Sequence, residues 1–403
     1  MKTFLMKWQC KTVCLSLFIY PVLAYSQGDG VKLLRENGFE EIQLHETEDN
    51  LYVSLEDNVY RVSYEGIAAA IQKLHTLYPT DTIHLLLTNA GMVQLSINAF
   101  QNKGEWHIAT EYDDKRTRTM LEKEPIVASA NWKADVVLYP QISLDNHRLD
   151  RLYNAALNIA PAMHMTLWRG ASLTAQIVVP IWNNIGGTSD HVRPGWLTLQ
   201  QTWLEGALWH CQSTFGLFNR QRWGIHNLLQ RHLSKRCDLS LHIGSTGFWE
   251  ADGMRPIIER WKRFDISLHT EYYIPTIGLQ IEISGGHYTF GDYGGRIDLT
   301  RHFGETSVGV YARMSEDAHD GGFHFAIPMG NKHLTKHRRI RVRVTDYFDW
   351  EYRMVSDGKW IDKQYGIGYE TSPRENRSAD YMQAAYIEIQ LNKVLNKESK
   401  KTP

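Results

Sequence analysis

Several features that define common protein classes are missing from this 403-residue sequence. No segment is apolar over anything near the ~18 residues that a candidate membrane-spanning helix needs. No long block of basic residues occurs, and the formal net charge is only -1, so the electrostatic signature of a dedicated nucleic-acid-binding protein is absent. The sequence therefore predicts no helical membrane span and no nucleic-acid partner.

The motifs of frequent catalytic and metal centres are missing as well. The sequence contains no C-x-x-C, no H-E-x-x-H and no G-x-S-x-G, and its 18 histidines show no spacing typical of metal ligands. No glycine-rich loop joins a strand to a helix in the manner of a nucleotide-binding fold. We therefore expect no metal, no cofactor and no catalytic residue, and a protein that is not an enzyme.

Residues 1–26 have the organisation of a cleavable secretory signal peptide. Lysines precede an apolar run from Val13 to Leu23, and Ala24 and Ser26 follow with the spacing of a cleavage site. Two of the 4 cysteines, Cys211 and Cys237, lie beyond this segment. In an oxidising compartment these two cysteines either form a disulfide or stay free, and their spacing alone does not decide between the two states.

Two segments with different periodicities follow. Residues 31–110 mix alternating runs such as NLYVSLE with the helical spacing of GIAAAIQKLHTLY, which predicts a small α/β domain. Residues 133–353 form a series of alternating runs separated by turn clusters, which predicts an antiparallel, mainly β body of roughly 12 strands. Residues 354–403 form a C-terminal tail in which SADYMQAAYIEIQLNKVLNK fits a helix or a final strand.

The alternation within the β body leaves each strand with one apolar and one strongly polar face. In RIDLTRHFGETSVGVYARM, the apolar face carries Ile297, Leu299, Val308 and Val310, and Gly304-Glu305 forms the turn. The same pattern fits a soluble sheet, whose apolar face meets a core, or a transmembrane β-barrel, whose apolar face meets lipid. The runs average about ten residues, the length of a tilted membrane strand, and this favours the barrel.

Aromatic residues near the ends of the runs also fit a barrel, because tryptophan and tyrosine gather at membrane interfaces. In that arrangement the apolar side chains of the hairpin face lipid, and its charged side chains face the interior. The aromatic residues expected in this girdle are Trp168, Trp182, Trp196, Trp203, Trp223, Trp249, Tyr272 and Tyr273.

The order of several segments resembles the YjbH/GfcD family of outer-membrane exopolysaccharide and capsule proteins. SLEDNVYRVSYEGIAAAIQKL is similar to the small α/β module of that family, and LNIAPAMHMTLWRGASLTAQIVVPIWNN is similar to one of its barrel hairpins. VRPGWLTLQQTW, STFGLFNRQRWGI, GGRIDLTRHFGETSVGVYA and FHFAIPMG continue the similarity in the same order over about residues 40–350.

This resemblance implies an outer-membrane β-barrel with one periplasmic module that takes part in exopolysaccharide or capsule export and assembly. Its implied partners are outer-membrane lipid, a surface polysaccharide and other exopolysaccharide-secretion proteins of the cell envelope. The family supplies no catalytic residues.

The polar strand faces provide candidate lumen residues. Two interpretations remain open: these side chains contact a passing glycan, or they form interstrand salt bridges that fill a narrow barrel. A different class of function is a secreted β-sandwich glycan-binding protein or glycoside hydrolase that uses Asp265, Glu271 or Glu282 as an acid pair. The candidates are Asp265, His269, Glu271, Glu282, Arg296, Asp298, His302, Arg339, Arg341 and Arg343.

Overall fold

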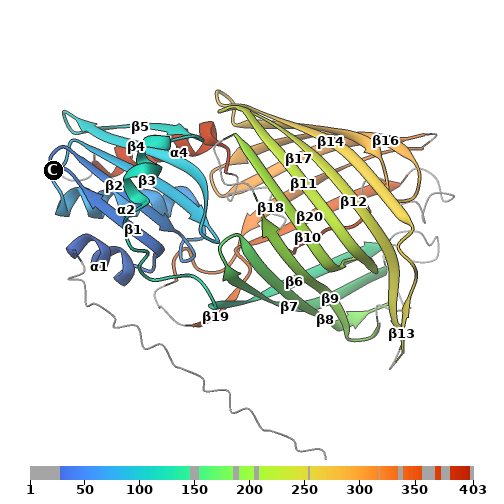
Figure 1. The fold of residues 1–403 in the computed structure, drawn as a ribbon. Coiled ribbons are helices and arrows are strands. Elements are labelled where there is room, and N and C mark those ends of the chain that lie inside the picture. The colour runs from blue at the N-terminus through green and yellow to red at the C-terminus, as the bar shows by residue number, and fades with distance from the viewer. Residues whose placement is uncertain are drawn as a thin grey trace, which may run out of the picture.

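The computed structural model of the chain is mainly β, with two sheets that belong to two adjoining units (Figure 1). The expected signal peptide lies outside the residues that the structure describes. Those residues are 28–145, 154–184, 190–203, 208–252, 255–316, 318–334, 339–355, 368–373 and 382–399.

The small unit contains a five-stranded sheet in the order β1-β2-β3-β4-β5. Helix α2 connects the parallel strands β2 and β3, and the other neighbours are antiparallel. Apolar residues of β2 and α2, including Leu51, Leu55, Ile67 and Ile71, form a fully buried core. The elements are α1 (Asp29–Glu36), β1 (Glu40–Glu46), β2 (Asn50–Glu56), α2 (Ser63–Leu77), β3 (Thr82–Asn89), β4 (Met92–Asn102), β5 (Glu105–Glu111) and α3 (Lys115–Leu121).

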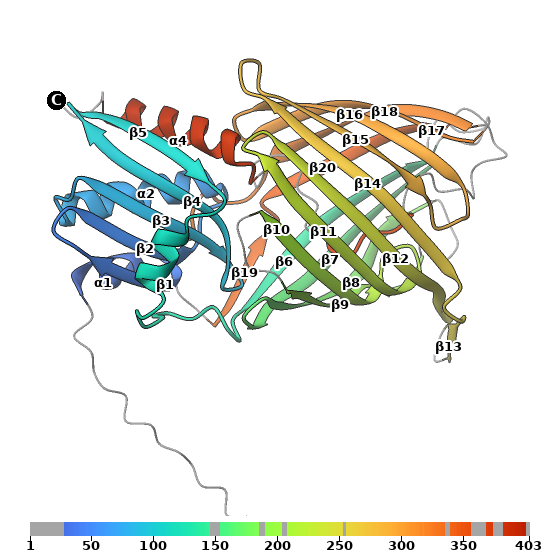
Figure 2. The same ribbon diagram turned by 45° about the horizontal axis from the view of Figure 1, so that its top comes forward.

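The C-terminal helix α4 (Ala384–Ser399) completes the small unit and lies alongside β5 (Figure 2). Leu391 and Leu395, one turn apart, are fully buried in its core. Asn396 receives the backbone N–H of Trp106 at 2.8 Å and donates to the carbonyl of Trp106 at 3.0 Å. The helix therefore satisfies backbone groups of an edge strand, and the C-terminal segment is a structural part of this unit.

The large unit is a 15-stranded sheet, so the expectation of roughly 12 strands is wrong. The run RRIRVRVTDYF, which looks like one strand, contains β19 and the start of β20, and the short β13 forms an additional hairpin with β12. The strands are β6 (Ala134–Asp145), β7 (Asn154–Trp168), β8 (Ala171–Asn183), β9 (Arg193–Thr202), β10 (Trp209–Phe218), β11 (Arg222–Ser234), β12 (Cys237–Asp252), β13 (Arg255–Ile258), β14 (Arg263–Ile274), β15 (Leu279–His287), β16 (Tyr293–Phe303), β17 (Thr306–Ser315), β18 (Ala318–Pro328), β19 (Ile340–Val344) and β20 (Tyr347–Val355).

The large sheet is almost entirely antiparallel and curls round on itself (Figures 1 and 2). Its hydrogen-bonded path begins at β19, which is parallel to β6, and ends at β20, which is antiparallel to β18. Strand β20 also contacts β6, but within the described part of the chain no hydrogen-bonded ladder joins the two edges. The sheet is curled and open.

The large sheet has an inverted polarity, with apolar side chains on its outer face and polar side chains on its inner face. On β14, Asp265 and Ser267 are buried, whereas Ile266 and Leu268 are exposed. The hairpin of β16 and β17 repeats this pattern, because Asp298 is 6% exposed and Val310 is 55% exposed. The apolar side chains of this hairpin therefore lie on the outer face of the sheet, and its turn lies at Gly304, whose φ of 65° suits glycine.

The predicted aromatic girdle is wrong for three of its members. Trp196, Trp249 and Tyr273 are buried. The alternation places Trp196 and Tyr273 on the inner face, whereas Trp249 has the parity of the outward-facing Leu241 and Ile243 and donates its Nε1–H to the carbonyl of Arg222 at 3.0 Å. Trp168, Trp182, Trp203 and Tyr272 are exposed. Cys211 and Cys237 are both free, so the structure contains no disulfide between them. Among the helices that are described, none is long and apolar enough to cross a membrane.

Candidate functional site

The two units meet through a buried ion pair between Arg61, which lies between β2 and α2, and Glu305 in the turn between β16 and β17. The Nε of Arg61 donates to Glu305 Oε2 at 2.8 Å, and its Nη1 donates to the carbonyl of Gly330 at 2.9 Å. Lys332 contacts the other oxygen of Glu305 at 2.9 Å. Burial alone would raise the pKa of Glu305, but hydrogen bonds and positive charge from Lys332 and Arg61 outweigh it and lower the pKa.

A second ionic contact joins β1 to β6 and to the edge strand β19 of the large sheet. Glu40 of β1 is almost fully buried. Its Oε1 accepts hydrogen bonds from Lys133 Nζ at 2.8 Å and from Arg341 Nη1 at 3.3 Å. Arg341 of β19 also donates to Asp135 of β6. Since buried charges need partners to offset lost hydration, these contacts fix the relative position of the two units.

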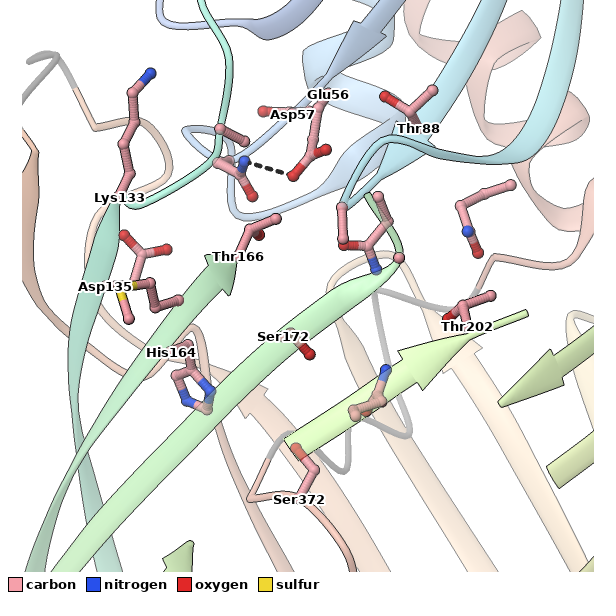
Figure 3. Close-up of a pocket in the computed structure, with 18 of the residues that line it drawn as sticks. Glu56, Asp57, Thr88, Lys133, Asp135, His164, Thr166, Ser172, Thr202 and Ser372 are labelled. Atoms are coloured by element: carbon pink, nitrogen blue, oxygen red, sulfur yellow. Dashed lines mark hydrogen bonds between the residues drawn. The ribbon is translucent and has the colours of Figure 1, made fainter. Parts of the chain in front are cut away.

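A polar cavity of about 480 Å³ lies between these contacts, where the small unit faces the inner side of the large sheet (Figure 3). Glu56, Asp57 and Thr88 approach from the small unit, and Asp135 and His164 approach from the large sheet. Hydroxyl and amide groups provide most of the remaining polar lining, from Asn58, Ser63, Asn89, Gln94, Thr166, Ser172, Thr174, Gln200, Thr202, Gln212 and Ser372. This lining offers both donors and acceptors to a neutral polar ligand.

The carboxyl group of Glu56 is the most deeply buried acid of this cavity. Burial raises its pKa, and hydrogen bonds from Asn58 and from the backbone of Gly91 partly oppose the increase. Asn58 Nδ2 lies 2.9 Å from Glu56 Oε1, and Gly91 N lies 3.2 Å from Oε2. Glu56 is therefore held in one orientation at the cavity wall.

A smaller chamber of about 190 Å³ adjoins the main cavity. The two share Gln94, His210 and Met382 in their walls, so they are compartments of one junction cavity. The carboxylates of Asp238 and Glu271 line only the smaller chamber.

A segment of residues 368–373, here called the inner strap, lies against the inner face of the large sheet. The hydroxyl of Tyr369 lies 3.2 Å from both oxygens of Asp265, and its ring stacks on Phe218 at 5.1 Å. Glu370 exchanges two hydrogen bonds with Asn219, at 2.8 and 2.6 Å, and accepts one from Trp196 Nε1 at 2.8 Å. The strap is therefore held specifically in the sheet interior.

The structure brings several of the predicted lumen residues together in one row across the sheet. Asp238, Glu271, Glu282 and Asp298 are consecutive register partners on β12, β14, β15 and β16. Glu282 lies 3.3 Å from His269, and Glu271 accepts a hydrogen bond from Gln280 at 3.0 Å. The row therefore includes two acids that were candidates for an acid pair.

Three other candidates contact polar side chains nearby. Arg296 contacts Asp298 at 2.6 Å and Glu351 of β20 at 2.9 Å. His302 lies 2.8 Å from Gln280 Oε1, and Arg343 pairs with Asp346. The contact of Arg296 with β20 and that of His302 with β15 favour the interpretation of interstrand pairing, whereas Arg343 and Asp346 are only three residues apart.

The remaining predicted residues do not share one location. Asp265 binds the inner strap, Arg341 belongs to the junction with β1, and Arg339 is exposed. Glu40, Arg61, Lys133 and Glu305 were missed by sequence reasoning. Arg61 and Glu305 are 244 residues apart, so no local pattern indicates their contact.

Among the described residues, no group of three or more histidine, cysteine, aspartate or glutamate side chains is arranged to hold a metal ion. Comparisons with family models, curated proteins and solved structures give no match to this chain.

Proposed function

We propose that this protein is an outer-membrane β-barrel that takes part in the export or assembly of an exopolysaccharide or capsule. In this proposal the large sheet crosses the membrane, and the small unit is a periplasmic module at one end of the barrel. The junction cavity contacts glycan, and the protein is not an enzyme.

The observation that carries the proposal is the inverted polarity of the large sheet. Residues such as Leu268, Ile283 and Val310 are exposed on the outer face, while Asp265 and His324 are buried on the inner face. Each Val, Leu or Ile side chain gains roughly 1.5–3 kcal/mol on full transfer out of water. A lipid environment recovers this free energy, because it covers an apolar surface that spans almost the whole sheet.

The strand dimensions also support a membrane barrel. Most strands of the large sheet are 9 to 16 residues long, from β15 to β12, and a tilted membrane strand needs about 9–11 residues. The contact between β20 and β6 brings the two edges of the sheet close to each other. Closure at these edges would remove unpaired backbone groups that hydrocarbon cannot solvate.

The glycan part of the proposal is supported by the lining of the junction cavity. Its amides, hydroxyls, imidazoles and carboxylates match the alternating donors and acceptors of sugar hydroxyl groups. The cavity connects the small unit with the interior of the proposed barrel. A protein that receives a polymer before its export requires such a connection. Other secretion proteins of the envelope are the proposed partners of the module.

Cell fractionation tests the membrane part of the proposal. We expect the protein in the outer-membrane fraction, with heat-modifiable migration in a gel because a folded barrel resists unfolding by detergent. Loss of surface polysaccharide in a deletion strain, restored by the intact gene, tests the role in export. Recovery in the soluble periplasmic fraction without heat-modifiable migration would contradict the proposal.

One observation favours a second candidate function, a soluble glycoside hydrolase. Glu271 and Glu282 oppose each other directly in the register of β14 and β15, which places their Cβ atoms about 4.5–5.5 Å apart. Retaining glycosidases hold their two carboxyl groups about 5–5.5 Å apart. Hydrolysis of a glycan by the pure protein, lost in Glu271→Gln and in Glu282→Gln, would favour this candidate, and inactivity on a glycan panel would exclude it.

A further inference from the structure

The smaller chamber of the junction cavity is formed by both units. Val93 and Gln94 of β4 and Tyr112, which follows β5, come from the small unit. The large sheet contributes His210, Gln230, His232, Asp238 and Glu271, and the segment before α4 contributes Met382 and Gln383. The chamber exists only when the module is docked on the sheet.

Gln383 is the residue of this chamber whose environment is incomplete. Its side chain is 2% exposed, and neither Nε2 nor Oε1 has a hydrogen-bond partner among the residues that the structure describes. An unsatisfied buried polar group destabilises the protein, so a ligand that both donates and accepts hydrogen bonds would be stabilised here. The backbone next to Gln383 is fixed, because Ala384 N donates to the Tyr112 hydroxyl at 3.0 Å.

One wall of the chamber is a rigid pair of rings. Tyr112 and His232 stack with their centroids 3.6 Å apart and their planes 5° from parallel. His232 Nδ1 lies 2.8 Å from Asp238 Oδ1, which fixes the orientation of the imidazole. A flat aromatic wall beside amides and carboxylates is suited to a ring-shaped ligand with apolar C–H faces and polar edges.

Size and charge limit the ligand further. The chamber volume of about 190 Å³ lies below the roughly 300–1,000 Å³ of sites for drug-sized molecules, so it suits one small ring. Asp238 and Glu271 line the chamber, and its described lining includes no lysine or arginine. The larger compartment, in contrast, includes Lys133 and Arg341.

From these observations we propose that the smaller chamber is a subsite for a single neutral or amino sugar unit and rejects acidic sugars. The identity of the ligand as part of a glycan rests on the proposed function. The amide of Gln383 binds hydroxyl groups of the sugar, the Tyr112–His232 pair packs against one face of its ring, and the two carboxylates accept hydroxyl or ammonium protons. A uronic acid is rejected because its carboxylate would lie beside Asp238 and Glu271.

Binding measurements on the full-length protein purified in detergent test this proposal. The probes are the methyl glycosides of glucose, glucosamine, N-acetylglucosamine and glucuronic acid, titrated by calorimetry and by saturation-transfer NMR. We expect binding of at least one non-acidic sugar and at least tenfold weaker binding of the glucuronide. Equal or tighter binding of the glucuronide, or no binding of any probe, would overturn the proposal.

Two pairs of variants assign the binding to this chamber. Gln383→Leu should weaken binding of the non-acidic sugar at least tenfold, whereas the same change at the exposed Gln101 should not. Glu271→Gln should reduce the discrimination against glucuronide, whereas Glu105→Gln at an exposed position of β5 should not. Gln383→Glu keeps the size of the side chain and should strengthen glucosamine binding, so it tests the site even if Gln383→Leu fails to fold.

The outcomes separate this inference from the proposed function. An outer-membrane protein that binds none of the probes would overturn the subsite and leave the membrane assignment in place. A soluble protein whose sugar binding depends on Gln383 would overturn the membrane assignment and leave the subsite. Wild-type affinity in both Gln383 variants would overturn the subsite whatever the location of the protein.

Discussion

Replacement of Arg61 by alanine should loosen the docking of the module on the large sheet. Arg61 is 6% exposed and makes four hydrogen bonds, two to Glu305 and one each to the carbonyls of Met329 and Gly330. Removal of one partner of a buried ion pair costs about 3–5 kcal/mol, because the remaining charge stays buried. Lys332 still contacts Glu305, so we expect a loss of about 3 kcal/mol, at the lower end of this range.

Hydrogen exchange provides the assay for Arg61→Ala. We expect amides near the junction, at the start of α2 and around Gly330, to exchange roughly a hundredfold faster, since each 1.4 kcal/mol corresponds to a factor of ten. A double-mutant cycle with Glu305→Ala isolates the pair and should give a coupling of at least 1.5 kcal/mol. Arg116→Ala, at an exposed position of α3, is the matched control and should change neither quantity.

The pH dependence of docking follows from the lowered pKa of Glu305. A depressed pKa in the folded protein means that the contribution to stability is present above the unfolded value, about 4.3 for glutamate, and is lost as the pH falls further. Docking should therefore be unchanged between about pH 6 and 8 and weaken below about pH 4.5. A coupling below about 0.5 kcal/mol, or an unchanged exchange rate in Arg61→Ala, would refute the assigned role of the ion pair.

Three further changes test other parts of the structure. Leu391→Ala in α4 removes a fully buried side chain and should lower the free energy of unfolding of the module by about 2–5 kcal/mol. Denaturant titration measures this loss, and Leu77→Ala at an exposed position is the control. Val310→Arg on the outer face should destabilise the protein in lipid vesicles by up to about 2–4 kcal/mol, whereas a soluble protein would tolerate it, since Val310 is already exposed. In the proposed barrel the inner strap occupies part of the interior, so Tyr369→Ala, which removes the contacts with Asp265 and Phe218, should raise single-channel conductance in planar bilayers. Tyr369→Phe keeps the stacking and should raise the conductance less. Equal conductance in all three proteins would contradict the proposal that the strap narrows a channel.

The polarity of individual strands could be predicted from the sequence because it depends on a local property. Successive side chains of a strand point to opposite faces, so the alternation of Asp265, Ile266, Ser267 and Leu268 determines which residues share a face. The alternation does not determine which face meets solvent, and the structure was needed to show that the apolar face is outside. The break between β19 and β20 was missed, because only Thr345 and Asp346 separate two strands with different partners.

The candidate site could not be predicted in the same way because its residues come from distant parts of the chain. The predicted lumen list contains Glu271, which lines the smaller chamber, and Arg341, which lines the larger one. Gln383 was assigned to a C-terminal tail, and its amphipathic neighbour α4 gives no sign in sequence of its partner β5. Contact between segments such as Trp106 and Asn396, 290 residues apart, depends on the tertiary fold.

The position of the inner strap bears on how a polymer could pass the sheet. Register places Tyr347 of β20 opposite Pro328, near the junction with Arg61, and Val355 opposite Asp320 at the far end. Helix α4, which follows later in the chain, packs against β5 of the module. Tyr369 and Glu370 of the inner strap bind Asp265, Asn219 and Trp196 on the inner face. In the proposed barrel, a glycan that crosses the interior therefore has to displace the inner strap or share the interior with it.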